Sequence, residues 1–520
     1  MGKQVGSEKL GKLYDGKMQV FKRREWRGFR DTFYDYWRWL KIMGMLSKFL
    51  MHPKNIKGFF RYRWMVNYLA VPMMIDKHAR GLRGEQLRIC RMEYDLVADD
   101  VAKLLTAIFK VDQNLGAKPE ASKNVVLVDE NEMTNIFSGF PNLAARSWET
   151  VSCYVCILLM QDAGYHYLDV VQECGLPGDV CPMPAMEAGV CIDDDMPIFG
   201  KCAVQCNTTC DGSLLGNGVI SRALERHGIP VFQLATPLRH TEPGVQDYAA
   251  QEIRNAIAFV EEQTGEKFDW NAYFECAKRI NIGARECANW LEMSKTDYPQ
   301  VIGNNILLYR ETEYMAIAGR VPAFAKTDVE ITKLARKAWE KKTMLAKEYR
   351  HRAIVWGVQS QFYTDIVAWM LNCWGILPLF DMLTMVSLEE IAEEDTPENR
   401  EQAIYDMAHQ YENMIMRNRT HGGYEVLLDD LWRYCEEYRA DMVILWEHIS
   451  CKALDGMHGM FEQQAREKGI HLVWVNHQLF DSRVIPRVSL RQDVNRYMRN
   501  VLNEEPLDSS LEEFDDSNLW

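Results

Sequence analysis

The sequence lacks any apolar run long enough to cross a membrane. The longest candidate, Ala368 to Phe380, is well short of the ~18 residues that a spanning helix needs. The first residues, MGKQVGSEKLGKLYDG, also lack the apolar core of a secretory signal. We therefore expect a cytoplasmic protein without a membrane span. Its 47% hydrophobic and 26% charged residues are typical of soluble globular proteins and exclude collagen-like and disordered chains.

Several familiar catalytic motifs are missing as well. The chain contains no GxGxxG or Walker loop, no GxSxG elbow and no HExxH pair. The sequence therefore gives little support for a nucleotide-binding protein, a serine hydrolase or a zinc protease. No sequence pattern of a nucleic-acid-binding fold is present either, so no nucleic-acid partner is expected.

Charge is distributed unevenly along the chain. The net charge is −14, but residues 1–90 hold 20 of the 60 basic and 7 of the 74 acidic residues, which leaves −27 for the remainder. Taken alone, such a basic and aromatic segment favours nucleic acid, an acidic membrane surface or a phosphate-bearing ligand, and composition does not choose among them. The acidic end of the chain, residues 503–520, is expected to be a disordered tail.

The length of 520 residues predicts two or three domains. Apolar residues recur at intervals of three and four in Glu25 to Leu50 and in much of Ile56 to Val111, which predicts helices. We expect the aromatic face of this helical region to pack on the rest of the protein or on a partner chain.

After Lys123 the pattern changes to short apolar strands separated by segments of helical length, which is typical of a parallel sheet in an α/β fold. The first group of strands is predicted in NVVLVDE, KCAVQC and IPVFQLATP. The second group is predicted in RAIVWGVQ, WGILPLF, ADMVILWE and IHLVWVN. The expected organisation is a helical N-terminal region, a first α/β domain, a helical connecting region, a second α/β domain and the tail, at residues 1–122, 123–242, 243–350, 351–502 and 503–520.

Fourteen cysteines in a chain without a secretion signal are not expected to form a disulfide framework. Cys181, Cys210 and Cys451 fall in predicted loops of two different domains. Cys210 and Cys451 follow predicted strands, and α/β folds bind ligands in such loops. Three thiolates are one short of the four that hold an ordinary iron-sulfur cluster or structural zinc, which would leave one metal position open to substrate. The plain alternative is that each is a small buried residue.

The remaining cysteines are better explained as core residues. Cys153 and Cys156 form a lone CxxC pair in a helix-like segment, which is weak evidence for a metal. We expect simple burial for Cys90, Cys202, Cys276, Cys287, Cys373 and Cys435.

Several short motifs occur in a fixed order: GDVC, then CNTTC followed by a helix and by IPVFQLATP, then FVEEQTGEKFDW, and finally SCK. Together they resemble the 2-hydroxyacyl-CoA dehydratase and benzoyl-CoA reductase family over roughly Asn124 to Leu502. The forms SCK and CNTTC are most similar to its α-type, substrate-binding subunits. The resemblance implies two Rossmann-like domains flanking a cleft that holds a [4Fe-4S] cluster. It also implies a heterodimer with a second, β-type subunit.

The resemblance implies particular roles for residues of this chain. The cluster ligands would be Cys181, Cys210 and Cys451, and Cys206 is the main rival to Cys210. Glu149 corresponds to the active-site glutamate of relatives. Where α-type relatives carry a histidine and an arginine before the SCK cysteine, this chain has Trp446 and Ile449.

The chemistry of the family explains why it needs such a centre. Removing water from a 2-hydroxyacyl-CoA requires loss of a β-proton that no side-chain base near pH 7 removes directly. One electron added to the thioester carbonyl gives a ketyl radical that expels the hydroxyl group, and the electron is then returned. An ATP-dependent iron-sulfur activator supplies that electron in this family, so the chain is expected to need one. The alternatives are an ATP-dependent reductase of the same family, a non-catalytic electron-relay or structural subunit, and a protein without a cluster.

Overall fold

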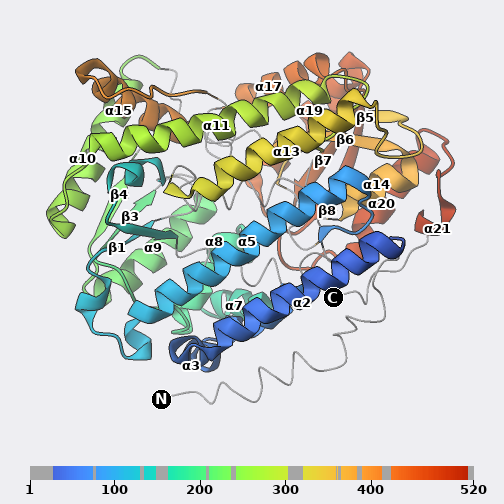
Figure 1. Cartoon of the computed structure of the whole chain (residues 1–520). Coiled ribbons are helices and arrows are strands. Elements are labelled where there is room, and N and C mark those ends of the chain that lie inside the picture. Colours follow the sequence, from blue (N-terminus) through green and yellow to red (C-terminus); the bar gives the residue numbers. More distant parts are fainter. Residues whose placement is uncertain are drawn as a thin grey trace.

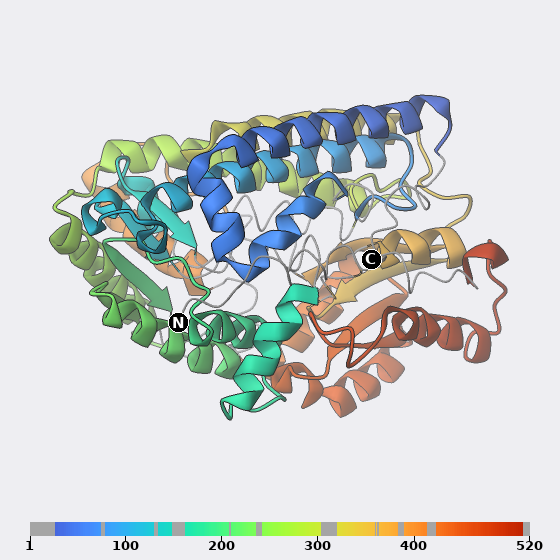
Figure 2. The same ribbon diagram turned by 90° about the horizontal axis from the view of Figure 1, so that it is seen from below.

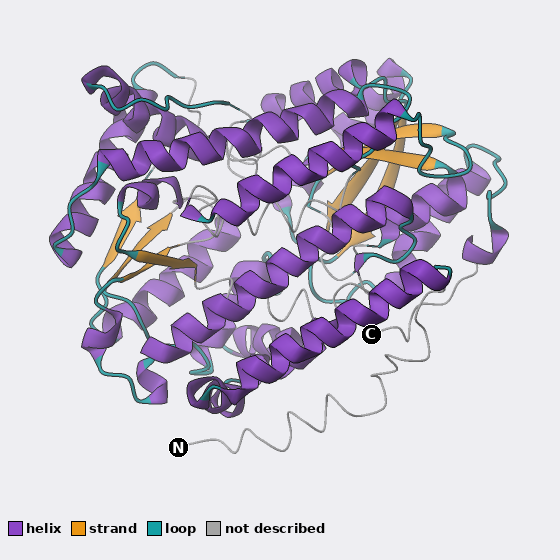
Figure 3. Ribbon diagram, viewed as in Figure 1, coloured by secondary structure: helices purple, strands orange, loops and turns teal. Residues whose placement is uncertain are grey.

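The structure is a computed structural model of the whole chain. It describes residues 27–73, 78–128, 134–147, 162–206, 210–235, 242–302, 320–358, 360, 363, 365–382, 389–412 and 423–512. Its strands form two separate groups at opposite ends of the molecule, each surrounded by helices (Figure 3). The predicted α/β class, with two Rossmann-like domains built on parallel sheets, is confirmed.

The first sheet contains four parallel strands in the order β2-β1-β3-β4. Their bounds are Val125–Val128 for β1, Ala144–Ser147 for β2, Cys202–Cys206 for β3 and Val231–Leu234 for β4. The sequence predicted β1, β3 and β4 but missed β2. This edge strand reads AARS, with burial only at every second residue, and alanine and arginine carry little strand preference.

The second sheet repeats the same arrangement. All four of its strands were predicted, and they lie parallel in the order β6-β5-β7-β8. Their bounds are His351–Trp356 for β5, Ile376–Asp381 for β6, Met442–His448 for β7 and His471–His477 for β8. In each sheet the second strand in sequence lies on one side of the first strand, and the third strand lies on its other side. Both sheets therefore reverse strand order between their first and third strands.

Four long helices form a layer that spans both domains. They are α2, α5, α11 and α13, at Phe29–Met51, Gly84–Val111, Trp270–Ser294 and Pro322–Glu340. They run side by side across the molecule (Figure 1), and Figure 2 shows the layer on one side of both sheets. The N-terminal region therefore packs with the helical connecting region. Two shorter elements, α3 (Pro53–Arg61) and the 3₁₀ helix η1 (Arg63–Met73), connect α2 to α5.

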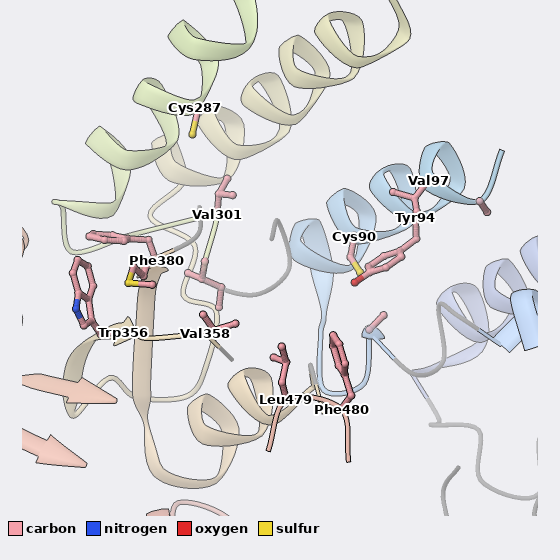
Figure 4. Packing of buried hydrophobic residues seen from close by; sticks show 14 of the residues in the cluster. Cys90, Tyr94, Val97, Cys287, Val301, Trp356, Val358, Phe380, Leu479 and Phe480 are labelled. Atoms are coloured by element: carbon pink, nitrogen blue, oxygen red, sulfur yellow. The ribbon is translucent and has the colours of Figure 1, made fainter. Parts of the chain in front are cut away.

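One buried cluster joins this layer to the second domain. Cys90 and Tyr94 of α5 belong to the same cluster as Val358 and Phe480, which follow β5 and β8 (Figure 4). Because these side chains come from distant parts of the sequence, their burial fixes the layer against the domain. Of the helices in the described ranges, none is both long and apolar enough to traverse a bilayer.

The shorter helices surround the two sheets. Helices α9 (Asp211–Arg226) and α10 (Val245–Thr264) pack on the first sheet, α8 (Pro182–Ile192) packs on α9, and α7 (Asp162–Glu173) packs on α8. In the second part of the chain the helices are α14 (Ile366–Trp374), α15 (Pro397–Glu412), α17 (Tyr424–Glu437), α18 (Lys452–Asp455), α19 (His458–Lys468), α20 (Arg487–Asn500) and α21 (Ser509–Glu512).

Helix α15 belongs to the second half of the chain but packs on the first domain. Its residues Ile404, Met407 and Tyr411 lie in one buried cluster with Val126 and Val204 of the first sheet. The sequence assigned this segment to the domain of residues 351–502, because it follows two strands of that domain. Sequence order does not reveal which sheet an amphipathic helix will cover.

The predicted disordered tail is ordered in its described part. The backbone N–H of Leu507 donates to the carbonyl of Cys373, and the indole N–H of Trp369 donates to the carbonyl of Leu511. Arg499 also pairs with Glu512 at 2.7 Å. Backbone hydrogen bonds and an ion pair therefore hold this part of the tail on the second domain. Residues 513–520 lie outside the described part of the chain.

Candidate functional site

Each of the three predicted ligand cysteines immediately precedes a helix. Cys181, Cys210 and Cys451 are the N-cap residues of α8, α9 and α18. Pro182 favours the start of α8, because the first helical position needs no backbone donor. Backbone N–H groups at the start of a helix stabilise negative charge and lower the cost of a thiolate. The three sulfurs are therefore placed where anionic ligands are favoured.

Cys210 and Cys451 occupy equivalent positions in the two domains. Cys210 follows β3, which pairs with β1, and Cys451 follows β7, which pairs with β5. In each sheet this is the point at which strand order reverses, and open α/β sheets bind ligands at such points. A single ligand between the domains could therefore be held by the corresponding loop of each.

The three cysteine segments lie close together. Cys210 is near enough to Cys451 that its charge raises the pKa of the Cys451 thiol. On the other side, Lys452 pairs with Asp179, with 3.3 Å between Nζ and Oδ2, which joins the Cys451 segment to the Cys181 segment.

Glycines on α9 let α8 approach closely. A Cβ atom at Gly212 would lie 3.2 Å from Cys181 Cβ, and one at Gly216 would lie 2.7 Å from Pro184 Cβ. A larger side chain at Gly216 would force the two helices apart. The glycines thus set the separation between the Cys181 and Cys210 segments.

Burial controls the charge of Cys451. It raises the pKa of this thiol to about 11, the neighbouring Cys210 adds to that rise, and the backbone N–H of Leu454 partly opposes it. Without a cation beside it, Cys451 is therefore a neutral thiol near pH 7. A bound metal would displace the proton, because metal ligation stabilises the thiolate. The Cys451 backbone N–H also donates to the carbonyl of His448 at 2.7 Å, which fixes the loop.

Two buried histidines lie behind Cys451. His448 and His477 end the paired strands β7 and β8, and their ring centroids are 5.3 Å apart. Burial lowers the pKa of His448 to about 3 and lowers that of His477 well below its ordinary value. Both rings are therefore uncharged near pH 7. This pair was not predicted from the sequence, in which a histidine directly follows each of two predicted strands.

The two positions that distinguish this chain from α-type relatives differ in exposure. Trp446 is completely buried within β7, whereas Ile449 is 41% exposed in the loop that leads to Cys451. The tryptophan is therefore part of the domain core, and the isoleucine is the one of the two that solvent reaches.

The other predicted residues are placed as follows. Cys206, the rival ligand, is buried at the end of β3, where its sulfur contacts the hydroxyl of Tyr411. Glu149, Cys153 and Cys156 lie outside the described residues. The six cysteines expected in the core are buried, namely Cys90, Cys202, Cys276, Cys287, Cys373 and Cys435.

In donor type, the three thiols fit an iron-sulfur cluster. Within the described ranges, no three His, Cys, Asp or Glu side chains are grouped to hold one metal ion. A [4Fe-4S] cluster spreads its thiolate ligands over separate irons, so these need not surround one point. Three half-buried cysteines at helix starts, contributed by two domains, suit such a group in donor type and placement. That they ligate a cluster stays a prediction.

A comparison with protein families gives a match over most of the chain. A family model described as 2-hydroxyglutaryl-CoA dehydratase, D-component, matches residues 149–494, which is about two thirds of the chain. The match begins at the predicted glutamate and includes all three cysteine segments. No curated protein matches the chain.

Proposed function

The chain belongs to the 2-hydroxyglutaryl-CoA dehydratase D-component family, and we propose that it is a [4Fe-4S]-bearing subunit of a 2-hydroxyacyl-CoA dehydratase. The observation that carries this proposal is the pairing of Cys210 with Cys451. These two cysteines follow equivalent strands of two different domains and interact electrostatically with each other.

Cys181, Cys210 and Cys451 would hold the cluster. When bound, a cluster with one iron free of cysteine supplies single electrons and a Lewis-acidic contact for an oxygen atom. The chain prepares the charge of this site. The N–H groups at the starts of α8 and α9 favour anionic sulfur, and the backbone N–H of Ser213 lies 3.4 Å from Cys210 Sγ.

The surroundings of Cys451 would limit access and charge. Its partial burial raises the pKa of the thiol, and the neutral rings of His448 and His477 add no competing charge behind it. A low-polarity wall strengthens every electrostatic interaction inside the site. Glu149 is the proposed catalytic residue, a role implied by the family resemblance alone.

The proposed enzyme needs other components. Family membership supports a second, β-type subunit and an ATP-dependent iron-sulfur activator, since the sequence carries no nucleotide loop of its own. The substrate class is a 2-hydroxyacyl-CoA thioester, which the reaction would convert to an enoyl-CoA with loss of water.

The test is an anaerobic turnover assay. The chain, a candidate second subunit and a family activator are mixed with ATP, a reductant and a panel of 2-hydroxyacyl- and aryl-CoA thioesters, and the products are separated by mass. The proposal predicts an enoyl-CoA product formed with only catalytic amounts of reductant, and loss of that product in Cys210→Ser.

Three results would contradict the proposal. Consumption of two electrons for every product molecule would identify a reductase instead. Full activity in Cys210→Ser would indicate that chemistry takes place on the other subunit, as in a relay or structural role. Formation of enoyl-CoA in the absence of both activator and ATP would exclude the electron-injection route.

A further inference from the structure

Helix α2 carries a ridge of large apolar side chains on the outside of the molecule. We define the α2 ridge as Phe29, Phe33, Trp37, Leu40 and Met51, which are 86%, 69%, 59%, 56% and 70% exposed. Their spacing of four, four, three and eleven residues places them along one face of the helix. A shallow apolar depression is lined by Phe29, Phe33 and Trp37 together with Arg30 and Tyr34. Exposed apolar surface of this extent in a soluble domain usually marks a binding surface.

The opposite face holds α2 firmly to the protein. Asp35, 0% exposed, accepts from Arg27 at 2.7 Å and from Arg91 of α5 at 2.6 Å. Ile42, Leu46 and Phe49 of α2 are buried in the main core cluster. The ridge is therefore a fixed feature of the surface, and Figure 2 shows α2 along one edge of the molecule.

The exposed charges beside the ridge are all positive. Arg30, Lys41 and Lys48 are exposed and, at intervals of eleven and seven residues, follow one border of the ridge. Lys41 also pairs with Asp95 of α5, with 3.6 Å between Nζ and Oδ2. The two acidic residues of α2, Asp31 and Asp35, both pair with Arg91 toward the protein. The chain as a whole has a net charge of −14, so this cationic border is a local exception.

Two possible occupants are disfavoured by charge. A second copy of the ridge would bring together six cations without an exposed acid on either α2. The segment that precedes the helix, residues 1–26, carries seven Lys and Arg against three Asp and Glu, so it is itself basic. An anionic occupant is required to complement this face.

We propose that the α2 ridge binds the surface of an anionic phospholipid bilayer. A helix that presents Phe, Trp and Leu beside Lys and Arg is suited to lie in the membrane interface, with the rings among the headgroups and the cations on the lipid phosphates. Apolar side chains that extend along one face of a helix beside cations suit the interface of a bilayer, which adapts to their shape. This interaction is peripheral and independent of the chemistry at the cysteine site.

The test is co-sedimentation of the full chain, purified without oxygen, with lipid vesicles. One set contains phosphatidylcholine alone and the other equal parts of phosphatidylcholine and phosphatidylglycerol. The protein is expected to sediment with the anionic vesicles only, and less at high salt. Lys48→Glu should weaken binding by fivefold or more, since removing one lysine alone is worth about fivefold. Trp37→Ser should weaken it by more than about tenfold.

Matched variants separate this effect from loss of folding. Tyr248→Ser changes an aromatic residue that is 50% exposed on α10, and Lys337→Glu reverses an exposed charge on α13, so both should bind as the unaltered chain does. Equal binding to both vesicle types, or none to either, would overturn the proposal. Protection of α2 from hydrogen exchange by the second subunit, without vesicle binding, would also overturn it and assign the ridge to a protein interface.

Discussion

Lys452 and Asp179 form an ion pair across the two α/β domains, with 3.3 Å between Nζ and Oδ2. One residue directly follows Cys451 and the other lies two positions before Cys181. The pair therefore marks where the two candidate ligand segments meet. Both side chains are more than half exposed, and exposed ion pairs contribute little to stability. Packing of the helices, and not this contact, must hold the segments together.

Lys452→Met is accordingly expected to leave the protein almost unchanged. The free energy of unfolding should change by less than about 1 kcal/mol, and the iron content should stay that of the unaltered chain. Denaturant titration and iron analysis provide the two measurements. A large loss of iron would mean that the ion pair positions the site.

Gly216→Ala is expected to destabilise the first domain. The new Cβ atom would lie 2.7 Å from Pro184 Cβ and 2.8 Å from the Pro184 carbonyl oxygen, so α8 and α9 must separate. Such overpacking costs about 1 to 3 kcal/mol. The midpoint of thermal unfolding should fall, and the iron content should fall with it because α8 and α9 carry Cys181 and Cys210.

Gly218→Ala in the same helix is the matched control. No atom lies within 4 Å of a Cβ at this position, and alanine favours helix over glycine by up to about 1 kcal/mol. The midpoint should stay constant or rise. Equal losses in both variants would show that helix α9, and not its contact with α8, responds to the substitution.

Asp35→Asn is expected to loosen α2. Asp35 and Arg27 are each 1% exposed at the side chain, and Arg91 is 7% exposed, so the substitution leaves two buried guanidinium groups without their shared carboxylate. Breaking a buried pair of this kind costs about 3 to 5 kcal/mol. Faster tryptic cleavage within α2 and a lower unfolding free energy should follow.

Asp31→Asn provides the comparison for that experiment. Asp31 also pairs with Arg91, at 3.0 Å, but its side chain is 34% exposed. The expected loss is at most about 1 kcal/mol. If both substitutions had the same small effect, the network would not be the anchor of α2.

The free energy of unfolding should depend on pH through His351, which contacts Glu504 in the ordered part of the tail. Burial alone would lower the pKa of His351, but hydrogen bonds to Asp441 and Glu504, at 2.8 and 2.9 Å, outweigh burial and raise it. Protonated His351 therefore stabilises the folded state fully below its unfolded pKa of about 6.5. That contribution is lost as the pH rises through the raised native pKa.

The stability difference between the unaltered protein and His351→Gln should consequently be largest near pH 6 and shrink toward pH 9. Denaturant titrations at a series of pH values measure it. A difference that grows with pH would contradict the assignment of a charged His351 in the folded state.

Sequence patterns predicted most of the fold because, among the eight strands in the described residues, seven are short apolar segments. They failed at β2, whose residues Ala144–Ser147 owe their strand conformation to pairing with β1. They also failed for α15 and the tail. Residues such as Tyr411 and Leu511 find partners far away in sequence, and local composition does not encode those partners.

The candidate site was only partly accessible from the sequence. The motifs indicated Cys181, Cys210 and Cys451 as candidates and predicted the helix after Cys210, but not the helix starts at Cys181 and Cys451 or the close approach of Gly212 to Cys181. The buried pair of His448 and His477 depends on the register of β7 with β8, which is a tertiary property. The sequence therefore indicates candidate residues, while the surroundings that set their charge depend on the tertiary structure.

Iron and sulfide analysis of protein purified without oxygen tests the central claim most directly. The account predicts about four iron and four sulfide atoms per chain, and a loss of most of them in Cys181→Ala, Cys210→Ala and Cys451→Ala. Cys373→Ala, which alters a cysteine buried in the core of the second domain, should retain the full content. Stoichiometric zinc, absence of iron, or full iron retention in all three ligand variants would contradict the account.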